Sequence, residues 1–162
     1  MFDLILEYAN AVWNPYKRKD VIALENVQRR ATKMIPVLNK MSYSERLEKL
    51  RLPTLVYRRA RGDMIEVFKE LNSTVKDINP GITLNSSVSR GHNQKILKQR
   101  CKKDVRKYFF THRVVNLWND LPNKVVESKN LITFERNLDF HWKNAEFKYN
   151  YNAPYPCRQS GK

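Results

Sequence analysis

The sequence predicts an all-α protein: a small helical bundle in two halves joined by a polar connector, with a frayed C-terminal tail. Leu, Ala, Lys, Arg and Glu, which favour helix, are abundant in the 162 residues, and there are only 4 glycines. Apolar residues recur at intervals of three and four along several segments, which is the period of one helix face. Aromatic residues make up 11% of the chain, enough to contribute to a packed core.

The composition changes along the chain and divides it into four parts. Residues 1–71 and 94–144 carry helical periodicity, and the second of these segments is strongly basic. Residues 72–93 are rich in Ser, Asn, Gly and Thr, with a turn at Asn79-Pro80-Gly81, and are predicted to be a flexible connector. Residues 145–162 are rich in Tyr, Asn and Pro, which predicts a disordered tail.

Two helices are predicted at the start of the chain. An apolar helix runs from Phe2 to Trp13 and ends at Asn14-Pro15. A second helix covers Asp20 to Ile35, with Asp20 at its N-cap. The apolar residues of this second helix form one stripe that is expected to be buried: Val21, Leu24, Val27, Ala31, Met34 and Ile35.

Two capping signals define the next helices. Ser42 and Glu45 form a capping box that opens a short helix to Leu50, and Thr54 is the expected N-cap of a longer helix to about Leu71. The side chains expected to face inward are Tyr43, Leu47, Leu50, Tyr57, Ala60, Met64, Ile65, Phe68 and Leu71. Those expected to face mostly outward are Arg58, Arg59, Arg61 and Asp63.

The stretch RKYFFTHRVVNLWNDLP, from Arg106 to Pro122, combines aromatics with cations. It suits either a nucleic-acid surface or one amphipathic helix, capped by Asp104, whose aromatics face a core. Five apolar residues of the stretch fall on one helical face, so the core interpretation is favoured for them. They are Phe110, Val114, Leu117, Trp118 and Leu121. Tyr108 and Phe109 lie towards the edge of that face and stay candidates for contact with a base or a partner helix.

A last helix is predicted to begin at Asn130 or Ser128. Its expected buried residues are Leu131, Phe134 and Leu138, with Phe140 or Trp142 as further candidates.

Positive charge is the strongest global property of the sequence. The chain carries 31 Lys and Arg against 16 Asp and Glu, a formal net charge of +15, which points to a polyanionic partner and to nucleic acid first. From Arg90 to Arg113 the only acid is Asp104. The predicted phosphate-contacting residues are Lys98, Arg100, Lys102, Lys103, Arg106, Lys107 and Arg113, followed by Arg29, Arg30 and Lys33. The alternative is a solvated basic surface without a dedicated ligand.

No catalytic arrangement is recognisable in the sequence. It has no phosphate-binding glycine loop, no nucleophile elbow and no paired aspartates for two-metal chemistry. His92, Cys101 and His112 have the wrong spacing for common zinc modules. We therefore expect no catalytic residues, no metal, no cofactor and no small-molecule substrate.

The two cysteines and the hydropathy bear on the compartment. Cys101 and Cys157 lie far apart and form no disulfide framework, which is typical of an intracellular protein, with nucleus and cytoplasm both open. No apolar window reaches the length of a membrane span, so a membrane partner is not expected.

Several phrases together resemble one protein family. They are LEYANAVWNPYKRKDVIALENVQRRATKMI (Leu6–Ile35), YSERLEKLRLPTLVYRRARGDMIEVFKELN (Tyr43–Asn72), RGHNQK (Arg90–Lys95) and RKYFFTHRVVNLWNDLPNKVV (Arg106–Val126). In this order, and over nearly the whole chain, they resemble the C-terminal region of LINE-type, non-LTR retrotransposon reverse transcriptases of the jockey-like animal group.

The resemblance implies that residues 1–71 correspond to a thumb-like segment and that the remainder lies beyond the thumb. The family's polymerase palm carries a tyrosine-x-aspartate-aspartate motif, which this sequence lacks. The expected function is therefore that of a truncated remnant of an RNA-directed DNA polymerase, without polymerase activity. Such a remnant would bind RNA or an RNA–DNA primer–template without sequence preference, through phosphate contacts. The rival expectation is a helical interaction module that packs on a reverse transcriptase palm domain or on a second copy of itself.

Overall fold

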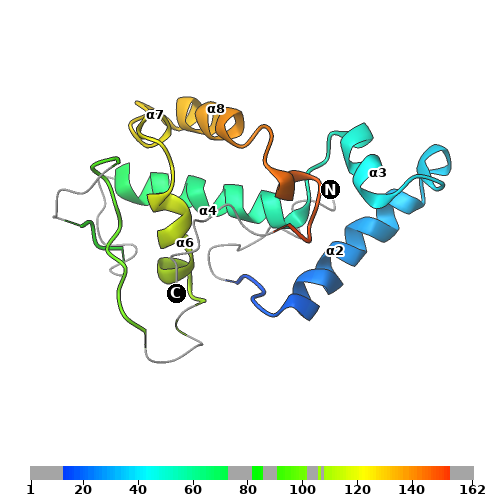
Figure 1. Ribbon diagram of the computed structural model, residues 1–162, viewed down its shortest axis with the longest axis horizontal. Coiled ribbons are helices and arrows are strands. Elements are labelled where there is room, and N and C mark those ends of the chain that lie inside the picture. The colour runs from blue at the N-terminus through cyan, green and yellow to red at the C-terminus, as the bar shows by residue number, and fades with distance from the viewer. Residues whose placement is uncertain (1–12, 73–81, 86–90, 102–105, 107, 154–162) are drawn as a thin grey trace. The chain divides into compact units, whose positions relative to one another are not determined.

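The computed structural model describes residues 13–72, 82–85, 91–101, 106 and 108–153. The described part is mostly helical, which confirms the predicted all-α class (Figure 1). The helices in chain order are α2 (Arg18–Lys33), η1 (Pro36–Leu38), α3 (Tyr43–Leu50), α4 (Leu55–Asn72), α6 (Phe110–Asn119), α7 (Asn123–Val126), α8 (Leu131–His141) and η2 (Glu146–Lys148). The predicted helix from Phe2 to Trp13 lies outside the described residues, apart from Trp13 itself.

The chain divides into two compact units, and the division falls inside α4. The first unit is Met1–Ala60 with Asn144–Tyr155, and the second is Arg61–Lys143 with Pro156–Lys162. The sequence places the boundary at residues 72–93 instead. The difference arises because α4 is one continuous helix whose first turns pack within the first unit and whose later turns pack within the second.

In the first unit, α2 buries a polar face. The predicted apolar stripe is wrong, because Val27 and Met34 are exposed while Glu25, Gln28 and Thr32 are buried. Each buried polar group finds a partner. The Tyr43 hydroxyl donates to Glu25 Oε1 at 2.6 Å. Arg46 Nε donates to Thr32 Oγ1 at 3.3 Å, and Arg58 Nη2 donates to Gln28 Oε1 at 2.7 Å.

The predicted caps of α3 and α4 are confirmed. The Ser42 side chain accepts from the Glu45 amide, and the Glu45 carboxylate accepts from the Ser42 amide at 2.7 Å, which completes the capping box. Thr54 Oγ1 accepts from the Tyr57 amide at 3.1 Å. Tyr43 and Leu47 are buried as predicted, whereas Leu50 is exposed.

The segment after Ala145 corrects the prediction of a disordered tail for residues 145–153. The Thr54 hydroxyl donates to the Phe147 carbonyl at 2.7 Å, and the Thr54 amide donates to the Lys148 carbonyl at 2.9 Å. Phe147 is 1% exposed and lies against Tyr57, with ring centroids 5.3 Å apart. Polarity of the segment suggested fraying, but a single buried phenylalanine and two hydrogen bonds anchor it. Residues 154–162 lie outside the described residues.

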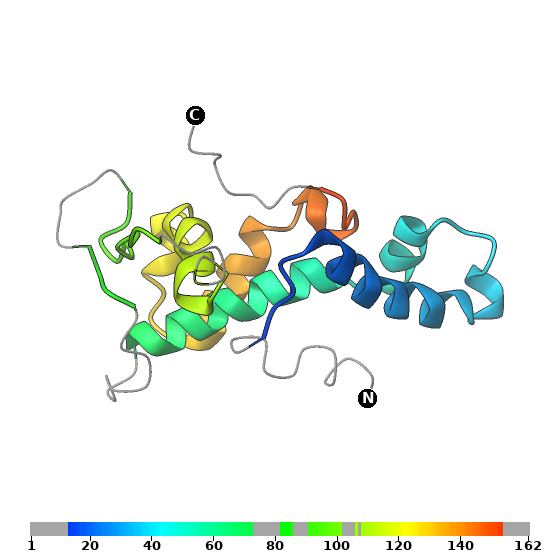
Figure 2. The same ribbon diagram turned by 90° about the horizontal axis from the view of Figure 1, so that it is seen from below.

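The second unit has an aromatic core between α4, α6 and α8. Phe68 and Phe134 stack with ring centroids 4.3 Å apart, and Trp118 lies 5.9 Å from Phe134. In both views α6 and α8 lie beside the second half of α4 (Figure 1, Figure 2). Phe110, Leu117 and Trp118 are buried, so the core interpretation of these residues is confirmed.

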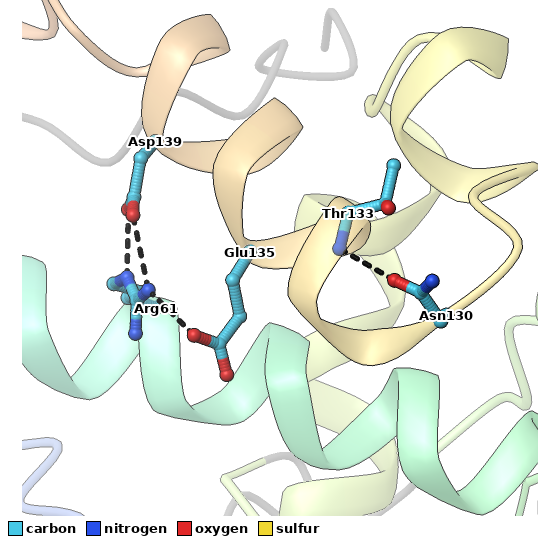
Figure 3. Close-up of polar contacts among 5 residues, drawn as sticks. All are labelled: Arg61, Asn130, Thr133, Glu135 and Asp139. Atoms are coloured by element: carbon cyan, nitrogen blue, oxygen red, sulfur yellow. Dashed lines mark hydrogen bonds and ion pairs between the residues drawn. The ribbon is translucent and has the colours of Figure 1, made fainter.

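The ends of α6 and α8 are only partly as predicted. The sequence predicts one helix, capped by Asp104, through the stretch from Arg106 to Pro122. Instead, α6 begins only at Phe110, and its N-cap is Phe109 in an extended conformation. Asp104 itself lies outside the described residues. Asn130 is the N-cap of α8, and its side chain accepts from the Thr133 amide at 2.8 Å (Figure 3). Phe134, Leu138 and Trp142 are buried, and Phe140 is exposed.

Some described residues of the predicted connector make contacts within the second unit. Leu84 forms an antiparallel bridge with Ile96, and His92 is buried with Nε2 3.1 Å from the Trp118 carbonyl oxygen. Burial lowers the pKa of His92 below its ordinary value. These contacts are made by Thr83, Leu84, Asn85 and His92, and residues 73–81 and 86–90 of the predicted connector lie outside the described residues.

Candidate nucleic-acid interface

An extended segment carries the basic residues of the second unit along α6. Asn119 holds one end, because its side chain donates to the Ile96 carbonyl at 2.9 Å and accepts from the Ile96 amide at 2.8 Å. The Trp118 indole donates to the Gln94 carbonyl at 2.8 Å. Further along, Cys101 contacts His112 near the other end of α6. The segment from Ile96 to Cys101 therefore runs antiparallel to α6.

This path places Lys98 alongside α6 and brings Arg100, next to Cys101, towards the N-terminal end of that helix. Lys98 and Arg100 lie between the two anchors and are exposed. Arg106 is exposed as well, and its carbonyl accepts from the Phe109 amide at 3.2 Å, directly before α6. The first turn of α6 has no acidic residue and no side-chain cap. The positive end of the helix dipole therefore adds to the positive charge at this point.

Two exposed aromatic residues follow Arg106 in the chain, just before α6. Tyr108 is 37% exposed and Phe109 is 56% exposed, in contrast to the buried Phe110 that follows them. The bend at Tyr108 and Phe109 explains the difference, because it takes both residues out of the α6 register that buries the later aromatics. Exposed aromatic faces next to cations suit stacking on bases with simultaneous contact to phosphates. We call Lys98, Arg100, Arg106, Tyr108 and Phe109 the basic–aromatic patch.

Arg113 is placed differently from the other predicted residues. Its Nη2 and Nε donate to the two carboxylate oxygens of Asp63 at 2.8 and 2.9 Å. The side chains of Arg113 and Asp63 are 13% and 7% exposed. Arg113 therefore joins α6 to α4 inside the second unit, and we do not include it in the basic–aromatic patch.

The arginines at the start of α4 are also engaged, which corrects their predicted outward placement. Arg59 and Asp63 are buried, and Arg59 Nη1 donates to Asn14 Oδ1 at 3.1 Å. Arg61 donates to both carboxylate oxygens of Asp139, at 2.7 and 3.0 Å, and to Glu135 at 3.3 Å (Figure 3). These cations bind acceptors of the protein, so they are poor candidates for phosphate contacts.

The remaining predicted residues fall into two groups. Arg29, Arg30 and Lys33 are exposed on α2 and belong to the first unit, whereas the basic–aromatic patch belongs to the second. Lys102, Lys103 and Lys107 lie outside the described residues.

Neither a metal cluster nor a membrane span is found in the part of the chain that the structure describes. No group of three or more His, Cys, Asp and Glu side chains there could hold a metal ion. His92 binds the Trp118 carbonyl, whereas His112 contacts Cys101, so the histidines are separately engaged. Among the same residues, no helix is both long and apolar enough to cross a bilayer.

The sequence pointed to the exposed cations but missed the residues that position them. Asn119 gave no signal, because an asparagine that binds backbone across 23 residues looks like any solvated asparagine. The contact between Cys101 and His112 was also missed, since the residues were weighed only as zinc ligands.

No protein-family model, curated protein or solved structure matches this chain.

Proposed function

We propose that this chain is the C-terminal helical part of a LINE-type reverse transcriptase and that it binds RNA or an RNA–DNA primer–template through phosphate contacts, without polymerase activity of its own. The basic–aromatic patch is the observation that carries the proposal. The resemblance of the quoted phrases to that family supports the origin, and the net charge of +15 supports a polyanionic partner.

The patch combines the two features that sequence-independent binding needs. Lys98, Arg100 and Arg106 are exposed, so they can reach phosphates without first losing a partner within a buried ion pair. Tyr108 and Phe109 offer ring faces that stack on any base. Base edges are not read by such contacts, and a strong sequence preference is therefore not expected.

The test is fluorescence-anisotropy binding of the full chain to a labelled RNA–DNA primer–template over a salt series. The test variant combines Lys98→Gln, Arg100→Gln and Arg106→Gln. The matched control combines Arg29→Gln, Arg30→Gln and Lys33→Gln on α2, which removes the same charge from exposed positions of the other unit. We expect the patch variant to weaken binding and to reduce the slope of log K against log salt by roughly one per lost phosphate contact.

Each outcome is informative. If both variants lose affinity equally, binding depends on net charge and the patch is not a site. If the control alone loses affinity, α2 rather than the patch carries the phosphate contacts. If the wild-type chain does not bind above a random peptide of equal charge, the proposed function is refuted.

A second candidate function rests on the exposed apolar side of the first unit. Met34, the C-cap of α2, is 82% exposed, Val37 is 80% exposed, and Val27 is exposed within α2. Such a surface suits an interaction with a reverse transcriptase palm domain or with a second copy of the chain. Sedimentation velocity without nucleic acid tests it: Val27→Lys with Met34→Lys should convert a dimer to a monomer, and a monomeric wild-type chain would exclude self-association.

A further inference from the structure

Helix α8 carries large apolar side chains on its outer side as well as on its inner side. Phe134 and Leu138 face the core of the second unit and are fully buried. Ile132 and Phe140 belong to the same helix, but they are 81% and 75% exposed. The sequence offers Phe140 as a candidate for burial, and the fold leaves it in water. Apolar side chains exposed to this degree are available to a partner.

The two exposed apolar residues share one face of α8 with a cation. Ile132, Arg136 and Phe140 follow one another at intervals of four residues, so they lie on one face and span about 12 Å of the helix. Arg136 is exposed, and exposed lysines stand before and after the helix, at Lys129 and Lys143. None of these three cations forms an ion pair with another described residue. We call Ile132, Arg136 and Phe140, together with Lys129 and Lys143 at the two ends, the outer stripe of α8.

The acidic residues of α8 lie outside the outer stripe. Glu135 and Asp139 bind Arg61 of α4, at 3.3 and 2.7 Å, and these contacts hold both carboxylates on the side of α8 that faces α4 (Figure 3). Their side chains are still 37% and 48% exposed. The outer stripe is therefore a narrow line of apolar and positively charged groups, with partly exposed carboxylates on one flank.

This combination determines which partner fits. Ile132 and Phe140 require apolar side chains opposite them, and the cations require carboxylates placed between those apolar side chains. A helix that alternates acidic and apolar residues on one face supplies both. An anionic bilayer is broader than the stripe and would also meet the carboxylates on its flank. RNA fits less well too, because Ile132 offers no ring on which a base can stack.

A second copy of the same stripe is also a poorer partner. Ile132 and Phe140 stand symmetrically on either side of Arg136. Antiparallel pairing of two stripes about that point would place arginine against arginine and Lys129 against Lys143, and parallel pairing would place every cation against itself. The net charge of +15 adds to the repulsion between copies.

We propose that the outer stripe of α8 is a docking surface for an acidic amphipathic helix of a partner protein. The apolar side chains of the partner cover Ile132 and Phe140 and supply most of the affinity. Its carboxylates pair with the cations of the stripe and set the register of the two helices.

The experiment measures binding of two labelled synthetic peptides to the full chain by fluorescence anisotropy. The patterned peptide is helical and repeats glutamate and leucine on one face at the spacing of the outer stripe. The scrambled peptide has the same composition and helicity without that face. Because both peptides carry the same charge, the ratio of their affinities reports the pattern and not the general attraction of an acidic peptide to a basic chain. We expect the patterned peptide to bind roughly tenfold more tightly.

The first pair of variants tests the apolar part of the stripe. Ile132→Ser with Phe140→Ser should abolish the preference for the patterned peptide. Val27→Ser with Met34→Ser is the matched control, because it removes two exposed apolar side chains from the first unit, and it should keep the preference. Circular dichroism verifies that each variant folds as the wild-type chain does.

The second pair tests the charged part and keeps both apolar side chains. Arg136→Glu should weaken binding of the patterned peptide several-fold more than Lys124→Glu does. The control makes the same change of charge at an exposed position of α7. Equal losses in the two variants would show that net charge, and not the stripe, attracts the peptide.

Equal affinities of the wild-type chain for the two peptides would overturn the proposal, as would a preference that Ile132→Ser with Phe140→Ser retains. Anionic phospholipid vesicles and the RNA–DNA primer–template are titrated in parallel. If that variant loses vesicle or RNA binding without any change in peptide preference, the stripe belongs to that polyanion and the proposal fails. The peptide preference does not involve RNA, so it is decisive whether or not the chain binds nucleic acid.

Discussion

Glu25 is the residue on which the start of α4 depends. Its carboxylate is buried, and it accepts from the Tyr43 hydroxyl at 2.6 Å and from the Leu55 amide at 3.1 Å. The Leu55 amide is one of the donors that a helix leaves without an intrahelical acceptor. Burial raises the pKa of Glu25 above its ordinary value, although Tyr43, Leu55 and Arg58 oppose that rise.

The raised pKa gives a signed prediction for pH. A carboxyl whose pKa is higher in the folded than in the unfolded chain favours folding most at pH values below its unfolded pKa, near 4.5, and this contribution is lost as pH rises through the folded pKa. Glu25→Gln cannot ionise, so its free energy of unfolding minus that of wild type should increase as pH rises from 4.5. Urea denaturation at several pH values measures this difference, and a difference that stays constant or decreases contradicts the prediction.

The same residue allows a second comparison at constant pH. Glu25→Ala leaves the Tyr43 hydroxyl and the Leu55 amide without their acceptor, so we expect it to reduce the free energy of unfolding by about 1–3 kcal/mol. Glu25→Gln keeps one acceptor oxygen, so its free energy of unfolding should fall by less. Equal effects of the two substitutions would mean that the hydrogen bonds contribute little.

Arg51 adopts a backbone conformation that glycine prefers. It ends α3 with φ 52° and ψ 33°, in the left-handed region. A Cβ atom is unfavourable there, and we expect Arg51→Gly to raise the free energy of unfolding by about 0.5–1 kcal/mol. Arg51→Ala is the control, because it removes the same side-chain atoms but keeps Cβ. A gain with alanine as large as that with glycine would place the effect in the side chain and not in the backbone.

At the scale of elements, ion pairs from α4 to its neighbours differ in burial. Asp63 binds Arg113 of α6 with both side chains largely buried, whereas Asp139 of α8 binds Arg61 with its own side chain 48% exposed (Figure 3). Asp63→Ala removes the carboxylate that binds a largely buried guanidinium and should reduce the free energy of unfolding by about 3 kcal/mol. Asp139→Ala should reduce it by less than about 1 kcal/mol, because water screens the exposed pair. Chemical denaturation of the two variants gives the comparison, and similar losses would contradict it.

The helices show which properties of an element are readable from its sequence. The capping residues Ser42, Thr54 and Asn130 were predicted correctly, because a cap acts within one turn of its own helix, whereas the predicted cap Asp20 lies in the first turn of α2, whose N-cap is Lys17. The buried face of α2 was predicted wrongly, because Glu25 and Thr32 are stabilised by partners on α3. Periodicity reports where apolar residues lie, but not where distant polar partners make a polar face the better one to bury.

In the candidate site, too, local properties were predictable from the sequence and contacts with distant residues were not. Exposure of Lys98, Arg100 and Arg106 agrees with the simple expectation that clustered cations remain in water. Arg113 looked equivalent to them, but its partner Asp63 lies 50 residues earlier in the chain. No local pattern indicates such a pairing, and only the fold distinguishes an exposed cation from one that joins two helices.

At the scale of the whole molecule, a net charge of +15 on 162 residues sets two opposing dependences on salt. Without a ligand, like charges repel one another in the compact state, so added sodium chloride should screen them and raise the melting temperature. The proposed RNA binding would stabilise the folded chain, by about 2.7 kcal/mol when the free RNA is at 100 times its Kd. Salt weakens phosphate contacts, so the shift caused by RNA should shrink as salt is added.

The two dependences make thermal unfolding a test of the basic–aromatic patch in the intact chain. We expect the melting temperature of the free chain to rise with salt, and the difference between RNA-bound and free chain to fall towards zero over the same series. In the Lys98→Gln, Arg100→Gln and Arg106→Gln variant the free chain should keep the rise with salt, because most of its charge remains, while the RNA-dependent shift at low salt should be smaller than in wild type. An RNA-dependent shift of equal size in the patch variant and in wild type would show that RNA stabilises the fold by binding elsewhere. A shift that persists unchanged at high salt would show that phosphate contacts are not its source.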